Sequence, residues 1–318
     1  MDAIIIANQI LILGVLIAIG AFATRIGVIN ENLKEGIARL VFNITLPLMI
    51  FTNFMHLDIT PGLLRNGANV LGLSLTALLL LLLTGILSSR LQGLAPRKKS
   101  IHTLHTLLGN TVFLGFPLTN ALFPGGDGLF YATLFFILSS TMMWTLGIYI
   151  MTRAQNPNLI KNLRHLINPN TIAFALGILL MLFGIRLPGV LDTSLTGLGS
   201  TTNYLSMLYI GAMLAQISIK GVLTRRSVYV LCFNKLLLVP FVMILLTSFL
   251  INTLNIELNH VARSVVVLQT GMPAMAVVVV LARRFGADDL LATENLFTST
   301  ILSLATLPFL YFLIGLVG

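Results

Sequence analysis

The sequence predicts an all-α polytopic membrane protein with ten transmembrane helices, arranged as two five-helix repeats of opposite orientation. Three observations predict this class. Apolar residues make up 57% of the 318 residues and charged residues only 9%, whereas soluble domains carry about 25% charge. Apolar stretches long enough to cross a bilayer recur along the whole chain. The loops between them alternate between rich and poor in Lys and Arg.

Each predicted helix corresponds to one apolar stretch of about 17–27 residues, which matches the roughly 20 residues that a helix needs to span a bilayer. The first five stretches precede the longest hydrophilic loop, and the other five follow it. In chain order they cover residues 4–24, 37–55, 67–89, 101–123, 129–152, 169–185, 195–218, 227–252, 261–282 and 290–316.

The basic residues predict the orientation of these helices. Fifteen of the 19 Lys and Arg residues lie in loops that follow odd-numbered stretches, three lie in loops that follow even-numbered stretches, and Lys235 lies inside the eighth stretch. Because basic loops stay on the cytoplasmic side, we expect the odd loops to be cytoplasmic and both termini to be extracytoplasmic. The basic residues are dispersed over five short loops, so they account for the net charge of +9 without nucleic acid as a partner.

The loop at 153–168 divides the chain into residues 1–152 and 169–318, with five predicted helices in each. Two repeats with an odd number of helices must have opposite orientations in the membrane. The sequence echoes are short: Gly115-Phe116-Pro117 in the fourth stretch and Gly271-Met272-Pro273 in the ninth. We therefore predict an inverted repeat, with 153–168 as its cytoplasmic connection.

The fourth and ninth stretches are the most polar and the most interrupted by glycine and proline. Broken backbone at membrane depth survives only when it is buried in protein or lines an aqueous cavity. The half-helices at a break carry unpaired N–H groups, whose partial positive charge suits a carboxylate. An alternative is that these residues only kink continuous helices. Their corresponding positions in the two halves favour two breaks near the midplane.

The motifs in these stretches resemble the auxin efflux carrier family of bacteria and plants, which includes the PIN-formed auxin carriers. The segment Asn110-Thr-Val-Phe-Leu-Gly115-Phe-Pro117-Leu118 is similar to the fourth-helix motif of that family, Asn-Thr-x-x-x-Gly-x-Pro-Leu. The segment Gln269-Thr-Gly-Met-Pro273 is similar to its ninth-helix motif. The resemblance covers essentially the whole chain.

The resemblance implies an NhaA-like fold, with a scaffold domain and a transport domain built around two crossed, discontinuous helices. It also implies transport of organic anions, such as dicarboxylates in bacteria and indole-3-acetate in plants. In the plant carriers the fourth helix breaks at a Pro-Asn pair, and the asparagine meets the substrate carboxylate. Here the pair is Gly109-Asn110, so the proline is absent, and the ninth-helix proline matches Pro273.

The break in the fourth helix is therefore expected either at Gly109-Asn110 or later, between Gly115 and Pro117. We favour the earlier position, because the resemblance pairs it with Pro273. Asn110 is the first candidate for substrate binding, since a carboxamide donates to a carboxylate without bringing its own charge into the bilayer. The full set of candidate binding residues is Gly109, Asn110, Thr111, Gln269, Thr270, Gly271 and Pro273.

Two charged residues are candidates for charge compensation or coupling. Lys235 is the basic residue inside a stretch, where it could neutralise a half-helix end, replace a coupling cation or attract the anion; alternatively, it snorkels to the cytoplasmic face. Glu294 is a candidate proton carrier, although an acid near a helix N-terminus is also favoured by the helix dipole. Asn43 and Asn203, in the second and seventh stretches, are candidates for lining the cavity or the scaffold interface.

Taken together, these features predict a secondary transporter of small mono- or dicarboxylates in the cytoplasmic membrane, working by alternating access. We expect no cofactor, no metal site and no enzymatic activity, because the sequence has no nucleotide-binding, hydrolase or zinc motif. A cation-coupled symporter or cation/proton antiporter of the same fold is the alternative, and an anion channel is a further one. The coupling ion, a proton or sodium, and a homodimeric assembly are left open.

Overall fold

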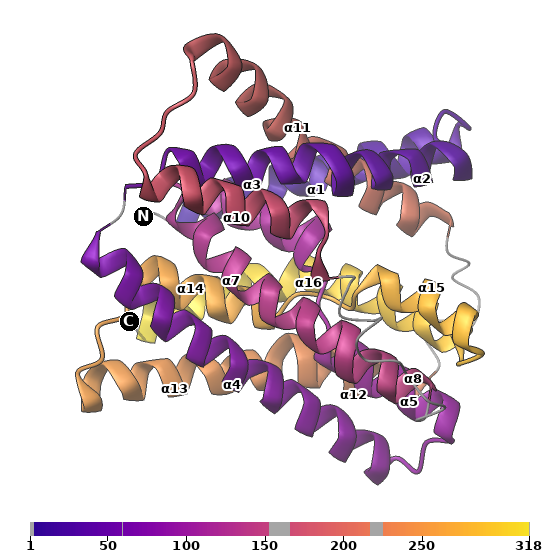
Figure 1. Cartoon of the computed structure of the whole chain (residues 1–318). Coiled ribbons are helices and arrows are strands. Elements are labelled where there is room, and N and C mark those ends of the chain that lie inside the picture. The colour runs from indigo at the N-terminus through magenta and orange to yellow at the C-terminus, as the bar shows by residue number, and fades with distance from the viewer. Residues whose placement is uncertain (1–2, 59, 153–165, 217–224, 318) are drawn as a thin grey trace. The chain divides into compact units, whose positions relative to one another are not determined.

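The computed structural model describes residues 3–58, 60–152, 166–216 and 225–317, and these residues are almost entirely helical (Figure 1). Each of the ten predicted stretches coincides with a helix or with a run of consecutive helices. In chain order these are α1 (Ala3–Arg25), α2–η1–α3 (Glu31–Met55), α4 (Pro61–Leu91), α5–η2–α6 (Pro96–Leu122), α7–η3–α8 (Asp127–Thr152), α10 (Pro169–Leu182), α11 (Gly189–Gln216), α12–η5–α13 (Arg226–Leu254), α14–α15 (His260–Phe285) and α16 (Asp289–Val317).

Five helical runs among the described residues are long and apolar enough to cross a membrane: Glu31–Met55, Pro61–Leu91, Asp127–Met151, Arg226–Leu254 and Asp289–Val317. Many of their large apolar side chains are exposed, such as Leu83 on α4 and Phe249 on α13. Side chains of this kind suit contact with lipid. The chain is therefore a multi-pass membrane protein; the number of ten spans and the inverted repeat stay predictions.

The described chain forms two compact units, and each takes segments from both sides of the 153–168 loop. The first unit comprises residues 1–67, 112–133 and 167–216, and the second comprises residues 68–111, 134–166 and 217–318. Spatial packing thus groups the chain differently from the sequence order. The predicted division into two repeats concerns sequence order, so it stays a prediction.

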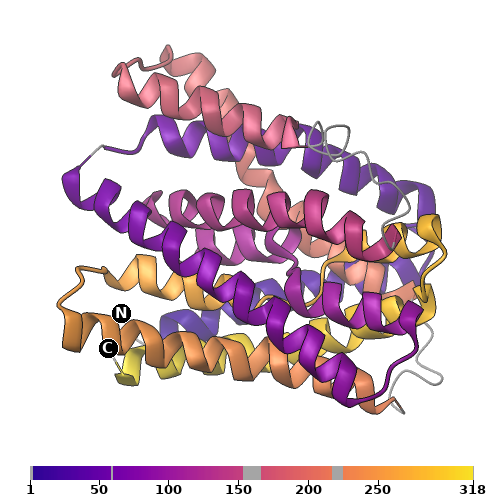
Figure 2. The same ribbon diagram turned by 60° about the horizontal axis from the view of Figure 1, so that its bottom comes forward.

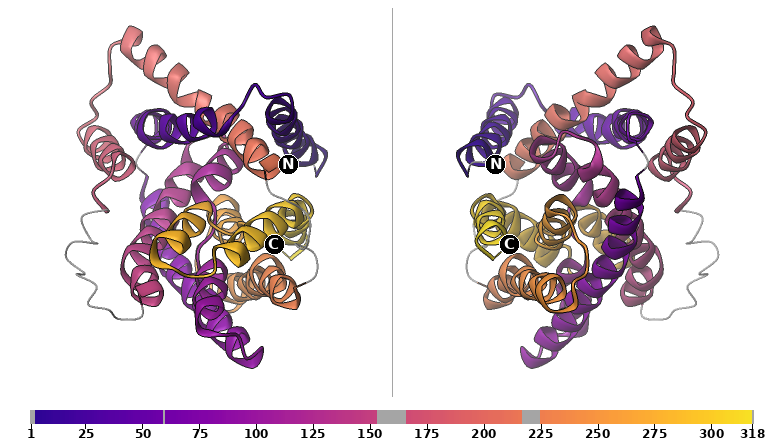
Figure 3. Two further views of the ribbon diagram at one scale, coloured as in Figure 1. Left: turned by 90° about the vertical axis from the view of Figure 1, so that its right-hand side faces the viewer. Right: turned by 90° about the vertical axis from the view of Figure 1, so that its left-hand side faces the viewer.

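The first unit is built on close contacts between helices at glycine. Gly211 of α11 lies so near α1 that an added Cβ would come 2.0 Å from the carbonyl oxygen of Ile17, and Gly20 of α1 faces Leu208 of α11 in the same way. Figure 3 shows α11 passing beside α1. Without a strong hydrophobic drive inside lipid, such close backbone approach is what holds membrane helices together. Gly199 and Gly177 make similar contacts with Met49 and Phe54 of α3.

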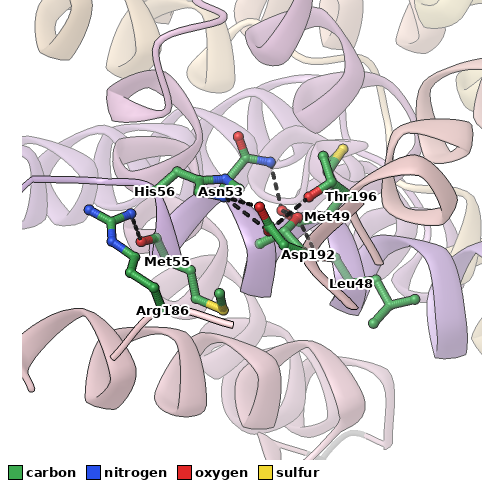
Figure 4. A network of polar contacts seen from close by, with 9 residues as sticks. Leu48, Met49, Asn53, Met55, His56, Arg186, Asp192 and Thr196 are labelled. Carbon is green, nitrogen blue, oxygen red and sulfur yellow. Dashed lines mark hydrogen bonds and ion pairs between the residues drawn. The ribbon is translucent and has the colours of Figure 1, made fainter. Parts of the chain in front are cut away.

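A polar network at one end of the first unit joins the end of α3 to the start of α11 (Figure 4). The His56 Nε2 atom lies 3.0 Å from a carboxylate oxygen of Asp192. Arg186 donates to the carbonyl oxygen of Met55 at 2.5 Å and lies 3.4 Å from Asp58. The bond from Arg186 satisfies a carbonyl group at the end of α3, where the backbone has no intrahelical partner.

The second unit holds both half-helices of the ninth stretch and the first half-helix of the fourth. Here α13 and α14 run side by side and are joined by a short loop, which is visible in orange in Figure 2. α16 packs against α5, α12, η5, α14 and α15. Buried polar side chains are concentrated on these elements.

Three π-helical turns share one cause, which is a proline in the second position of the α-helix that follows. Pro47, Pro117 and Pro240 follow η1 (Val41–Thr45), η2 (Thr111–Gly115) and η5 (Asn234–Leu238). Proline donates no hydrogen bond and its ring collides with the carbonyl four residues earlier. A π-helical turn adds one residue and moves that carbonyl away, so the helix continues through the proline.

Candidate functional site

Two helix interruptions face each other in the second unit. α5 (Pro96–Leu107) ends at an extended residue, Leu108, and helical structure resumes at Thr111. α14 (His260–Thr270) ends at Gly271, and α15 begins at Ala276. The fourth and ninth stretches are therefore discontinuous, and both interruptions lie among the residues of one compact unit.

The interrupted segments pair with each other as a short antiparallel bridge, here named the crossing (residues 108–111 and 271–275). Gly109 pairs with Ala274. The Asn110 N–H donates to the carbonyl oxygen of Pro273 at 2.7 Å, and the Met275 N–H donates to that of Leu108 at 3.2 Å. These bonds satisfy backbone groups that a broken helix would otherwise leave unpaired in a buried environment. The crossing is thus held by main-chain bonds.

Space around Gly109 is tight at the crossing. A Cβ atom at this position would lie 3.0 Å from the Met272 Cβ and 3.5 Å from the Met272 carbonyl oxygen. Because glycine has no side chain, the two strands approach each other here without that contact.

The fourth helix is interrupted at the earlier of the two expected positions. Gly115 and Pro117, which were expected as a helix break or hinge, lie in a continuous helical run instead, where η2 passes into α6 (Phe116–Leu122). The physical reason is the π-helical turn, which accommodates Pro117 without breaking the helix. Pro273 lies within the interruption of the ninth stretch, between α14 and α15.

The polar side chains predicted for substrate binding are all deeply buried at the crossing. Asn110, Thr111, Gln269 and Thr270 have exposed fractions of 2% or less. The Thr270 hydroxyl donates to the Val266 carbonyl oxygen of its own helix at 2.7 Å. This hydrogen bond lies within α14 and does not involve the crossing. The Thr111 hydroxyl has no hydrogen-bond partner among the described residues. Buried polar atoms of this kind need a partner, and a bound ligand can supply one.

Sequence reasoning missed Ser299 and His105 as members of this site. The Ala274 N–H donates to the Ser299 hydroxyl of α16 at 2.9 Å, and His105 Nε2 lies 3.2 Å from the Met275 carbonyl oxygen. Both are fully buried. The available signals were the Ser/Thr-rich tenth stretch and the position of His105 one turn before Gly109, but neither indicates which backbone group is the partner.

Lys235 lies on the π-helical turn η5 and is fully buried. Its ammonium donates to the carbonyl oxygen of Thr106, in the last turn of α5, at 2.9 Å. Since the side chain ends on this carbonyl, it does not snorkel toward the membrane surface. The structure therefore places Lys235 beside the first half-helix, and its role in coupling stays a prediction.

Glu294 forms an ion pair with an arginine. Its carboxylate lies 3.2 Å from Arg225, directly before α12, and the Glu294 side chain is 5% exposed. The N-terminal turn of α16 is capped by Asp288, which accepts from the Leu291 N–H at 2.8 Å. The ion pair compensates the charge of the Glu294 carboxylate, and no described contact joins this side chain to the crossing.

The two candidate cavity residues of the first unit are not brought together as a pair. Asn43 is exposed and donates to the Arg39 carbonyl oxygen of its own helix at 2.9 Å. Asn203 is half-buried, and its Oδ1 atom has no hydrogen-bond partner among the described residues. The buried polar contact between these helices is made by Thr45 and Thr202, whose hydroxyls lie 2.9 Å apart.

The crossing offers donors and carbonyl oxygens but no acidic side chain with a described contact to it. Among the described residues, no group of three or more His, Cys, Asp or Glu side chains is arranged to hold a metal ion. Interrupted, paired helices inside a multi-pass membrane protein are the architecture in which secondary transporters bind substrate at mid-membrane. The fold and the site thus define the class of membrane transport proteins.

Comparison with known proteins agrees with this class. The model of the family described as "Membrane transport protein" matches residues 5–311, so the chain belongs to this family, which is the auxin efflux carrier family that its motifs resemble. A transporter of Methanothermobacter thermautotrophicus is 28% identical over 308 residues, covering 92% of this chain and 93% of that protein. A transporter of Methanocaldococcus jannaschii is 25% identical over 304 residues, covering 93% and 95%. Both relatives are named only as uncharacterized transporters.

Proposed function

We propose that this transporter is a secondary carrier of small organic anions, with one carboxylate of the substrate bound at the crossing. The observation that carries the proposal is the pairing of the two interrupted helices through Asn110 and Pro273. The interruption brings helix ends into the interior of the second unit, and helix ends carry partial charge. In transporters with broken helices, half-helix N-termini face anionic groups of the substrate.

The charges at the crossing support an anion over a cation. Helical segments begin at Thr111 and at Ala276, and each start contributes about +0.5 of an elementary charge; α5 and α14 end there, and each end contributes about −0.5. These contributions cancel, and the Lys235 ammonium then adds positive charge beside α5. The sum is positive, which favours a carboxylate.

Asn110 supplies the side-chain part of this site. Its backbone N–H is bonded to Pro273, and its carboxamide is deeply buried beside that bond. A carboxamide N–H donates to a carboxylate without adding a charge of its own to the membrane interior. Thr111, Gln269 and Thr270, all buried beside it, are the next residues expected at the substrate.

Transport requires the site to open alternately to the two sides of the membrane, and we propose that the second unit carries it. This unit contains the crossing and its supporting residues Lys235, His105 and Ser299. The inverted repeat of 1–152 and 169–318 gives such a carrier two related conformations of similar energy.

The experiment that tests the proposal is uptake by purified protein in proteoliposomes. A panel of labelled mono- and dicarboxylates is offered with imposed proton, sodium and voltage gradients. Saturable uptake of at least one carboxylate, with counterflow of the same compound, is expected. Flux without saturation or counterflow would indicate a channel, and cation exchange without carboxylate uptake would indicate a cation antiporter.

We also propose that the protein lies in the cytoplasmic membrane with both termini outside. The asymmetry of basic residues between odd and even loops supports this orientation. Cys232 is the single cysteine of the sequence, so a Cys232→Ser background permits single-cysteine labelling. We expect an impermeant maleimide to label Asp58→Cys in intact cells and Lys98→Cys only after permeabilisation. The reverse pattern would overturn the orientation.

A further inference from the structure

Lys235 sits where a broken-helix transporter would otherwise hold a metal cation. In such transporters, unwound backbone carbonyls and the C-terminal ends of half-helices coordinate the coupling sodium ion. The last carbonyl groups of a helix have no intrahelical partner and carry partial negative charge. In this chain the carbonyl oxygen of Thr106, in the last turn of α5, accepts a hydrogen bond from the Lys235 ammonium at 2.9 Å.

Lys235 is buried and bonded inside the protein, so it does not act as a surface lysine in contact with water or lipid headgroups. The side chain is completely buried and is one of the largest fully buried side chains of the described protein. No salt bridge joins it to a carboxylate within the described part of the chain. A buried ammonium without an acidic partner is costly, so the helix end is the group that compensates its charge.

The turn that carries Lys235 gives it this position. η5 is a π-helical turn, caused by Pro240, and it lies between α12 (Arg226–Phe233) and α13 (Val239–Leu254). η5 packs against α5, the half-helix whose end Lys235 contacts. An ammonium ion and an alkali cation carry the same charge and are both held by carbonyl oxygens.

We propose that Lys235 is a tethered cation that occupies a monovalent-cation site at the C-terminal end of α5. With this charge supplied by the protein itself, the crossing needs no sodium ion at this end. The inference rests on the proposed function only in assigning that site to a carrier. Its test uses purified protein without any substrate, so an incorrect substrate class leaves the result unaffected.

The experiment compares thermal unfolding in detergent in choline chloride and in sodium chloride of equal concentration. Wild-type protein is expected to unfold at the same temperature in both salts. Lys235→Ala removes the charge and leaves space. In choline chloride this variant is expected to unfold at a lower temperature than wild-type protein. Sodium or ethylammonium is then expected to raise its unfolding temperature by about 2–4 °C, because a ligand that binds the folded state stabilises it.

Lys235→Met is the matched control, because it removes the charge while filling the same space. It is expected to be destabilised and to respond to no cation. Lys98→Ala, at an exposed lysine on α5, is expected to match wild type in both salts. Lys235→Ser, which leaves similar space and adds a hydroxyl, repeats the rescue arm if the alanine variant does not fold.

Each arm can overturn the proposal. A sodium-dependent stabilisation of the wild type would show that Lys235 does not replace the ion. A Lys235→Met variant as stable as wild type would show that no charge is needed. Unfolding of Lys235→Ala or Lys235→Ser at the same temperature in every salt would show that α5 ends in no cation site.

Discussion

The backbone N–H of Asn110 donates to the carbonyl oxygen of Pro273 at 2.7 Å. The structural role of Asn110 therefore belongs to its main chain, and the proposed role in substrate binding belongs to its side chain. The main chain of Asn110 holds two interrupted helices together, while its side chain is not required for that bond. The same residue thus lies at the structural centre of the crossing and next to the place proposed for the substrate.

Replacing Asn110 by alanine is therefore expected to remove transport and to keep the fold. The Pro273 bond persists in the variant, because alanine retains the backbone N–H. Loss of a buried donor to a carboxylate should reduce uptake by about tenfold or more. Proteoliposome uptake checks the loss of transport, and thermal unfolding of the same preparation checks that the fold is kept.

The matched control is Asn32→Ala, which makes the same change at an exposed position of α2 (Glu31–Leu40). It should alter neither uptake nor stability. Uptake by Asn110→Ala with wild-type KM and maximal rate would exclude the side chain from the substrate site.

Adding a methyl group at Gly109 is expected to strain the crossing. The new Cβ would lie 3.0 Å from the Met272 Cβ, a contact that requires movement of one strand. Overpacking of this kind costs about 1–3 kcal/mol. Thermal unfolding of Gly109→Ala, with Gly72→Ala as control, measures it; a Cβ at Gly72 meets nothing within 4 Å.

A double-mutant cycle locates this strain. Met272→Gly removes the atom that the new methyl group meets, so the double variant Gly109→Ala/Met272→Gly should be more stable than the sum of the two single changes predicts. Strict additivity would mean that the destabilisation arises elsewhere than at the contact between these two residues.

Much of this arrangement was predictable from local patterns. The ten helical segments follow from runs of apolar residues. The position of the fourth-helix interruption was expected at Gly109-Asn110, on the basis of the resemblance that pairs it with Pro273. Glycine and proline report on local backbone conformation, so an interruption leaves a trace in the sequence.

The rest depends on contacts between distant segments, which no local pattern encodes. The partners of Lys235, Ala274 and Glu294 lie 129, 25 and 69 positions away along the chain. Pro117 belongs to the later of the two expected break positions, and the structure has a continuous helical run there, with a π-helical turn that ends at Gly115. Composition does not distinguish these outcomes, because both relieve the same collision between the proline ring and the preceding turn.

Glu294 is expected to stabilise the fold through Arg225 instead of carrying protons. The carboxylate is 5% exposed and the arginine 33% exposed, so Glu294→Gln should lower the free energy of unfolding by about 1–3 kcal/mol. Arg225→Gln should cost more than the double variant, since it leaves the buried carboxylate unpaired. Chemical or thermal unfolding of the four proteins gives the coupling energy.

Uptake measurements distinguish a structural role of Glu294 from a role in proton coupling. If its role is structural, Glu294→Gln retains the response of uptake to an imposed pH gradient. A variant that still transports but no longer responds to that gradient would identify Glu294 as a coupling group. Glu31→Gln, at a carboxylate paired with Lys34 and 62% exposed, is the control and should change stability by less than about 0.5 kcal/mol.

The contact between α1 and α11 provides the sharpest test of the first unit. An alanine at Gly211 would place its Cβ 2.0 Å from the carbonyl oxygen of Ile17 and 2.7 Å from the backbone nitrogen of Ala21. Backbone atoms cannot rotate away as a side chain can, so the two helices must separate. Because small residues allow this close approach, Gly211→Ala should destabilise the protein by about 3 kcal/mol or more.

Gly14→Ala, on the partner helix α1, separates the effect of the contact from that of helix propensity. A Cβ at Gly14 meets nothing within 4 Å, so this change should be neutral or stabilising by up to about 1 kcal/mol. Circular dichroism during heating in detergent compares the two variants. Equal unfolding temperatures for Gly211→Ala and Gly14→Ala would contradict the close crossing of α1 and α11, because only the first substitution places an atom between the two backbones.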